Sequence, residues 1–267
     1  ILVLVRVPDC PDYCRGVGID LETWMEKGLI DIVVGSGYFR LNFWTYIVNL
    51  GHSHQVKVYA GLSEPRVKYE HPLLIRLQNS VYRARSLAAW QAGVDGIYIF
   101  NEYNTRKKYL SEIGDQTKLE KTNNLYFATY RNANPASYLK DGKSYCSIPV
   151  LTPQNTLKLG SENVSLELEM GDESIPADIA LILYTREGNP ELIKAGLNGI
   201  SLEYSKSTDD GLSVFKVPAT SVRPGKNNLT LSCGNGSVPV TLLDAAVFFY
   251  RNKDDHENNE LVELCFQ

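Results

Sequence analysis

Acidic and aromatic side chains gather in the loops that follow four short apolar segments of the first 103 residues. Glycosidic bonds are cleaved by pairs of carboxylates, one acting as acid and the other as nucleophile or base. Tyrosine rings offer flat apolar faces with a polar tip, which suits sugar rings. The candidate catalytic residues are Glu64, then Glu102, then Asp9. The candidate substrate-binding residues are basic, aromatic and amide side chains of the same segments: Arg6, Tyr38, Arg40, Tyr59, Arg66, Asn101 and Tyr103.

Each of these charged candidates also has an ordinary structural explanation. Glu64 lies in a Ser-Glu-Pro turn, where it serves equally well as a surface carboxylate. Loop acids such as Glu102 often cap a helix or a loop, and an aspartate after proline, as at Asp9, is common for turn geometry alone. Arg6 lies in an apolar strand and must be paired if it faces inward. A structural ion pair explains Arg6 as well as contact with a substrate does.

A repeated unit of strand, loop and helix must position these loops. The expected strands are residues 1–7, 30–34, 56–60 and 96–100. The expected helices are residues 20–28, 44–50, 72–92 and 118–130. This alternation is typical of a parallel sheet covered by helices. In such folds the chemistry lies at the carboxyl ends of the strands, which is where the candidate residues are found.

After residue 134 the pattern changes to short alternating apolar runs separated by turn residues. The expected strands here are residues 164–170, 180–184, 211–217, 228–231 and 238–250. Strands at this spacing indicate an antiparallel sandwich. We therefore expect two domains, residues 1–134 and residues 135–267.

Several short motifs resemble a known enzyme architecture. In the first part they are Val5-Arg6-Val7-Pro8, Gly18-Ile19-Asp20, Thr23-Trp24, Gly28-Leu29-Ile30-Asp31 and Phe100-Asn101. These motifs resemble the second half of a family-10-like bacterial glycoside hydrolase barrel. In the second part they are Leu197-Asn198-Gly199, Phe215-Lys216-Val217-Pro218 and Arg223-Pro224-Gly225-Lys226-Asn227. These resemble the jelly-roll, galactose-binding-like modules that follow such barrels.

The resemblance implies an α/β plus all-β chain, in which half of a (β/α)8 barrel, four βα units, precedes an antiparallel β-sandwich. The four strands would then be strands five to eight of the barrel, and Glu64 would follow strand seven, where related enzymes carry the nucleophile. Those enzymes take their acid from strand four, which this chain lacks. The resemblance therefore implies a glycoside hydrolase fragment that acts on or binds a glycan and is not catalytic alone.

Two alternatives remain open for the function. One is a non-catalytic protein that binds an oligo- or polysaccharide through the aromatic loops. The other is a structural protein that self-associates through the open edges of the half barrel, because unpaired sheet edges invite pairing.

Composition narrows the choice of partners and location. The chain of 267 residues carries a net charge of −4, which argues against nucleic acid as a partner. No apolar run reaches the ~18 residues of a membrane span. We expect an extracellular or periplasmic location, as for related secreted enzymes. The Asn-X-Ser/Thr patterns begin at Asn163, Asn228 and Asn235.

We expect neither a metal nor a cofactor. Cys10 and Cys14 are spaced for a small disulfide or half of a metal site, but no second pair of ligands accompanies them. His52 and His54 lie between a helix and the next strand, on the far side from the candidate loops, and are expected to be ordinary loop residues.

Overall fold

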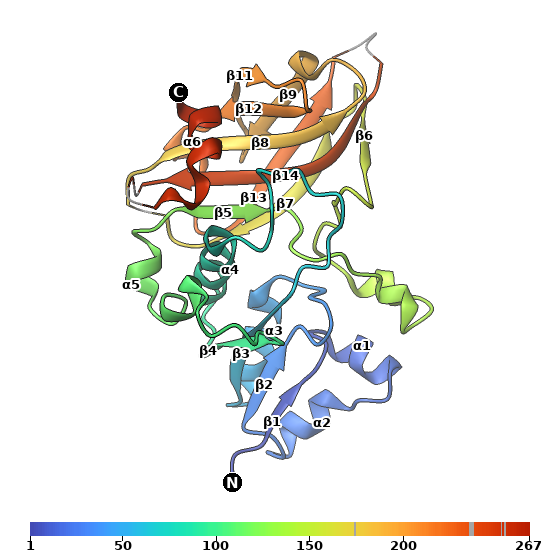
Figure 1. Cartoon of the computed structure of the whole chain (residues 1–267). Helices are drawn as coiled ribbons and strands as arrows, with labels where there is room; N and C mark the ends of the chain where they lie inside the picture. Colours follow the sequence, from blue (N-terminus) through green and yellow to red (C-terminus); the bar gives the residue numbers. More distant parts are fainter. Residues whose placement is uncertain (174, 235–237, 252, 254) are drawn as a thin grey trace.

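The computed structural model places a parallel sheet at one end of the molecule and two antiparallel sheets at the other (Figure 1). The structure describes residues 1–173, 175–234, 238–251, 253 and 255–267. The third Asn-X-Ser pattern, at 235–237, lies outside the described residues. Among the described residues, no helix is both long and apolar enough to cross a membrane.

The parallel sheet contains the four strands that the sequence predicts. They are β1 (Leu4–Arg6), β2 (Ile32–Gly35), β3 (Lys57–Ser63) and β4 (Gly96–Phe100), in that order across the sheet. All three pairings are parallel, so the four carboxyl ends meet at one edge.

This part contains three short helices, α1 (Pro11–Gly16), α2 (Leu21–Glu26) and α3 (Trp44–Ser53). The second and third lie close to the expected positions, whereas no helix was predicted at α1. Asp20 caps α2 as expected, because its carboxylate accepts a hydrogen bond from the Thr23 N–H. The prediction that the helix at residues 44–50 ends before Gly51 is wrong. Gly51 lies inside α3 because any Cβ there would overlap the side chain of Val58 on β3, so the glycine permits close helix–sheet packing.

Helix α4 (Asn79–Gln91) begins seven residues later than the predicted start at residue 72. Glu70 accounts for the difference, since its carboxylate accepts hydrogen bonds from the backbone N–H and the guanidinium of Arg76 and so holds the preceding turn. The N–H groups at the start of α4 are satisfied by a distant residue, because Glu257 accepts from both Asn79 and Ser80. Tertiary contacts, which sequence periodicity does not report, therefore set this helix start.

The predicted helix at residues 118–130 is wrong. The chain forms a single turn, α5 (Gln116–Leu119), and then strand β5 (Asn124–Phe127), which pairs antiparallel with β14 (Val240–Tyr250). All four residues of β5 are buried, so both faces of the strand are covered and its sequence shows no alternation. The chain thus enters the antiparallel part before residue 134.

The antiparallel part contains two sheets. One has the order β10-β9-β13-β7, and the other has the order β11-β12-β8-β14-β5 with β6 also paired to β14. Their remaining strands are β6 (Leu157–Leu159), β7 (Val164–Met170), β8 (Asp178–Arg186), β9 (Ile193–Leu197), β10 (Ile200–Ser201), β11 (Glu203–Ser207), β12 (Leu212–Lys216) and β13 (Gly225–Cys233). Each strand predicted after residue 134 is present.

The two antiparallel sheets share one hydrophobic core. Leu168 of β7 and Leu229 of β13 belong to the same buried cluster as Leu181 of β8 and Val247 of β14. On the far face of the larger sheet, α6 (Asn259–Phe266) packs Leu261 and its neighbours against β8, β12 and β14. The short 3-10 helices are η1 (Lys108–Ser111), η2 (Pro135–Ser137), η3 (Gly142–Tyr145), η4 (Pro190–Leu192), η5 (Ala219–Ser221) and η6 (His256–Asn258).

Helix α4 joins the two parts of the molecule. Every residue from Ser80 to Ala89 is buried. Its Tyr82 and Ala89 belong to the core of the parallel sheet, whereas Ala84 and Ala88 belong to the core of the antiparallel sheets. Figure 1 shows α4 between the two parts, next to β5.

We expect Gly171→Ala to lower the free energy of unfolding by about 1–3 kcal/mol, the usual cost of overpacking. An added Cβ would lie 2.9 Å from the carbonyl carbon of Leu87 in α4 and would overlap the Leu87 side chain. Urea denaturation measures the effect. Gly160→Ala is the control, because nothing lies within 4 Å of a Cβ there. Equal stability of the two variants would contradict this account of the α4 contact.

Candidate functional site

The loops that follow β1 to β4 bring most of the candidate residues to one edge of the parallel sheet. We call these loops, residues 7–9, 36–40, 64–66 and 101–104, the carboxyl edge. Two hollows adjoin it, and both are lined by residues of this edge together with the segment from 128 to 150, which approaches it from the antiparallel part.

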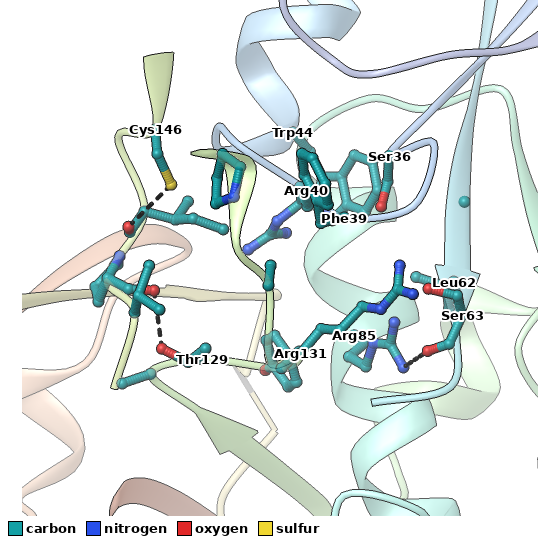
Figure 2. Close-up of a pocket in the computed structure, with 18 residues that line it drawn as sticks. Ser36, Phe39, Arg40, Trp44, Leu62, Ser63, Arg85, Thr129, Arg131 and Cys146 are labelled. Carbon is teal, nitrogen blue, oxygen red and sulfur yellow. Dashed lines mark hydrogen bonds between the residues drawn. The ribbon is translucent and has the colours of Figure 1, made fainter. Parts of the chain in front are cut away.

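The first hollow, the central pocket, lies where the carboxyl edge meets segment 128–150. It has a volume of about 40 Å³, and its walls include Arg40, Trp44, Ser63, Arg85, Tyr130 and Arg131. Figure 2 shows the side chains of Arg85 and Arg131 running side by side toward Ser63, with Arg40 across from them. The pocket is therefore small and lined by three guanidinium groups.

Within the described part of the chain, Arg40 alone of these three has an acidic partner. Its guanidinium lies 2.8 Å from the carboxylate of Glu169 on β7, and the other oxygen of that carboxylate accepts a hydrogen bond from the Trp44 N–H at 3.0 Å. Burial raises the pKa of Glu169, while Arg40 and the Trp44 N–H oppose the rise. Each oxygen of this carboxylate thus has a partner, and the two contacts connect β7 to Arg40 and to the start of α3.

Arg85 and Arg131 have no acidic partner among the described residues. The guanidinium of Arg85 donates to the backbone oxygen of Ser63 at 3.2 Å and lies over the rings of Tyr82 and Tyr130. Burial lowers the pKa of Arg85. Burial and, to a smaller extent, the positive charges of Arg66 and Arg85 together lower the pKa of Arg131 to about 10.

Arg6 and Arg66 extend this positive region. Arg6 donates to the backbone oxygen of Gly37 and lies 3.7 Å from the centre of the Phe100 ring, so the expectation that it reaches a carboxylate is wrong. Arg66 is exposed at the end of β3. Arg6, Arg66, Arg85 and Arg131, which we call the arginine cluster, have no ion pair within the described part of the chain.

The second hollow, the tyrosine groove, has a volume of about 200 Å³ and is lined by Arg6, Tyr13, Tyr38, Phe39 and Tyr138 among others. The rings of Tyr38 and Tyr138 stack with centres 5.9 Å apart. The two side chains are 52% and 60% exposed, although Arg6 lies over the Tyr38 ring at 5.5 Å and Phe39 packs against Tyr138. Part of each ring is therefore open to a ligand. Phe39 lines both hollows, which places the groove directly beside the central pocket.

The three candidate carboxylates lie in different environments. Glu64 is exposed and makes no hydrogen bond or ion pair among the described residues. Glu102 accepts hydrogen bonds from the Asn104 N–H and the Tyr109 hydroxyl, at 2.8 and 2.9 Å. These bonds outweigh the effect of burial and lower its pKa. Glu102 therefore holds its own loop, as the capping explanation expects.

Asp9 is completely buried and organises the neighbouring loop. Its two carboxylate oxygens accept hydrogen bonds from the N–H groups of Leu41 and Asn42, each at 2.9 Å. Burial raises the pKa of Asp9 to about 6, against the opposing effect of these hydrogen bonds and of Arg40. Asp9 thus fixes the chain between β2 and α3, which carries Arg40 into the central pocket.

The remaining candidates divide between the edge and the sheet. Asn101 accepts a hydrogen bond from the Tyr103 hydroxyl at 3.5 Å, and Tyr103 is 87% exposed at the end of β4. Tyr59 lies elsewhere, since its ring packs over Gly96 at the opposite end of β4. Sequence reasoning counted Tyr59 with the loop aromatics because it is near the strand end in the sequence, but β3 continues to Ser63.

Four residues of the site escaped sequence reasoning: Arg85, Arg131, Tyr138 and Glu169. A signal existed for Arg85, since an arginine among the apolar positions of a helix must meet a special environment. Arg131 and Tyr138 lie in a segment whose apolar residues show no helix or strand periodicity. Glu169 fits the alternation of polar and apolar residues along β7. The sequence therefore gives no signal for these three residues.

The other expected features have structural roles. His52 and Asp95 form a hydrogen-bonded pair at 2.9 Å on the far side from the carboxyl edge, and Asp95 also accepts from the Val58 N–H. Cys10 and Cys14 are buried free thiols, so they do not form the small disulfide. Within the described residues, no group of three or more His, Cys, Asp or Glu side chains is arranged to hold a metal ion.

Comparison with known proteins yields weak structural likeness only. No protein-family model matches the chain, and no curated protein sequence matches it either. Two crystal structures of BuGH86, a chain of glycoside hydrolase family 86, in complex with neoagarooctaose are similar to part of it, one of a glutamine-for-glutamate variant and one of the wild type. Their identities are 12% and 13% and their TM-scores 0.28 and 0.29.

These matches are short on both sides. They cover 35% and 37% of this chain, and the chain spans only 17% and 18% of the matched structures. The matched enzyme belongs to family 86, so the comparisons give no support to the family-10 resemblance.

We expect the stability difference between Asp9→Asn and the unchanged protein to depend on pH. The pKa of Asp9 is about 6 in the folded protein and 3.8 in its ordinary state, so its protonation favours folding and this contribution is lost as the pH rises toward 6. Asparagine does not titrate. Relative to the unchanged protein, the variant should therefore gain stability from pH 4 to 6 and change little above.

Urea denaturation at pH 4, 5, 6 and 7 measures this difference. Asp20→Asn is the control, because Asp20 is an exposed helix cap. A difference for Asp9→Asn that stays constant across this range would show that Asp9 is charged in the fold throughout.

Proposed function

We propose that the chain binds an oligo- or polysaccharide at the carboxyl edge, with the stacked pair Tyr38 and Tyr138 as the platform for a sugar ring. The observation that carries the proposal is this pair, because two parallel rings, each more than half exposed, lie in a groove of about 200 Å³. Sugars present apolar faces of C–H groups and polar rims, and tyrosine matches both. Glu64 and Tyr103, exposed on neighbouring loops, supply further hydrogen-bonding groups.

Binding is favoured over cleavage by the state of the carboxylates. Glycoside hydrolysis uses two carboxyl groups on opposite sides of the scissile bond. Asp9 is enclosed and Glu102 is held by Asn104 and Tyr109, which leaves Glu64 as the one candidate with a free carboxylate. If another group supplies the acid, we propose that Glu64 acts as the nucleophile of the hydrolysis.

We further propose that the parallel strands are half of a (β/α)8 barrel, that the antiparallel sheets are a β-sandwich, and that the protein works outside the cell or in the periplasm. The barrel is supported by the sheet face away from the helices, where Tyr59, Tyr98 and Phe100 are only partly covered. Self-association through this open face is the alternative.

We expect Tyr38→Ala and Tyr138→Ala each to weaken glycan binding about three- to tenfold, because a stacked aromatic contact contributes ~0.5–1.5 kcal/mol. Cello-, xylo-, agaro- and galacturono-oligosaccharides serve as probes, and titration calorimetry gives the affinity. Leu192→Ala, which removes an exposed side chain of the antiparallel part, should bind normally. The proposal fails if no probe binds or if both tyrosine variants bind as the unchanged protein does.

We expect the chain to bind its best probe without cleaving it, since Glu64 alone of the three candidate carboxylates has no partner among the described residues. A reducing-end assay over a day at pH 5 to 7 measures this. The opposite outcome is that the unchanged protein releases reducing ends and that both Glu64→Gln and Glu102→Gln abolish this release. It would show that these two residues form a working catalytic pair.

A further inference from the structure

The central pocket contains three buried hydrogen-bond donors without an acceptor. They are Nε and Nη1 of Arg131 and the hydroxyl of Tyr130, and none of them donates to an atom of the described residues. Buried polar atoms of folded proteins are nearly always hydrogen-bonded, so three orphan donors in one pocket need a physical reason. A ligand that accepts hydrogen bonds would supply it.

The charge of the pocket indicates what kind of acceptor this is. Burial is the main cause that lowers the pKa of Arg131 to about 10, and the positive charges of Arg66, Arg85 and Arg6 act in the same direction. Arg131 therefore still carries its own charge at neutral pH. The acid that faces this region, Glu169, is already bound to Arg40 and Trp44. Buried charges without a counter-charge are costly, and an anion would remove that cost.

The pocket's size and donors favour a carboxylate. A volume of about 40 Å³ admits a small group and excludes a sugar ring. A planar carboxylate is smaller than a tetrahedral sulfate, and its two oxygens match the parallel N–H groups of a guanidinium. The free Nε and Nη1 of Arg131, with the hydroxyl of Tyr130, offer donors of this kind.

The neighbouring tyrosine groove can hold the ring that carries the carboxylate. Phe39 lines both hollows, so a ring stacked on Tyr38 or Tyr138 lies next to the pocket. We propose that the central pocket binds the carboxylate of a uronic-acid residue, and that the preferred ligand of the chain is an acidic glycan. This inference rests on the proposed glycan binding and names the class of glycan.

Binding of tri-galacturonic acid and of its methyl ester, measured by titration calorimetry, tests the assignment. The two probes have the same sugar rings, and the ester carries a neutral, larger methyl ester in place of each charged carboxylate. We expect the acid to bind the unchanged protein at least tenfold more tightly than the ester, with a preference that shrinks as salt is raised. Arg131→Gln should remove the preference, and Arg186→Gln, which changes an exposed arginine of β8, should retain it.

Thermal unfolding without ligand gives a second, independent measurement. Because Arg131 is charged and lacks partners for its buried nitrogens, Arg131→Gln should unfold at the same temperature as the unchanged protein or at a higher one. A markedly lower unfolding temperature would show that Arg131 already has a stabilising partner and would overturn the inference.

The other outcomes are also decisive. Equal binding of acid and ester would overturn the carboxylate site and leave the proposed glycan binding intact, whereas binding of neither would refute both. Tighter binding of a sulfated galactan tetrasaccharide than of tri-galacturonic acid would assign the pocket to sulfate instead. A last outcome is that the protein forms dimers, that Arg131→Gln dissociates them, and that acid and ester bind equally. This outcome would assign the central pocket to a carboxylate from a second copy of the chain.

Discussion

The burial of helix α4 on every side is the constraint on which the rest of the structure depends. A helix covered all round must be apolar or must have each of its polar groups satisfied. Different faces of α4 contribute to the cores on either side, so neither part of the molecule has a complete core without it. The close approach at Gly171 shows how little space separates this helix from the antiparallel part.

The arginines in and before this helix show how the constraint is met. Arg76 is enclosed between Glu70 and Asp244, and Arg83 between Glu112 and Asp255. These carboxylates come from four different segments, so each ion pair also fixes the position of a distant part of the chain. Arg85 breaks the rule, since it has no acid beside it. The exception coincides with the central pocket, where the helix faces the carboxyl edge.

How much the sequence reveals depends on whether the relevant contact is local. The four parallel strands and the strand at 164–170 were predictable, because their apolar patterns reflect the face that each buries. Strand β5 was not, since a short run buried on both faces has the same pattern in a helix. The capping explanation for Glu102 rests on a local contact and could be stated from the sequence, whereas Asp9 accepts hydrogen bonds from Leu41 and Asn42, far along the chain, and its local turn sequence does not reveal them. The arginine cluster combines residues from positions 6, 66, 85 and 131, and only the fold brings them together.

Aromatic rings explain how this cluster persists within a stable fold. Arg6 lies over Phe100, and Arg85 lies over Tyr82 and Tyr130. Such contacts stabilise a cation by ~0.5–2 kcal/mol, the larger values applying where water is excluded. A ring face attracts the charge without neutralising it, unlike the carboxylates around Arg76 and Arg83. The rings can therefore hold the guanidinium groups in place while leaving their positive charge available to an anion that enters from outside.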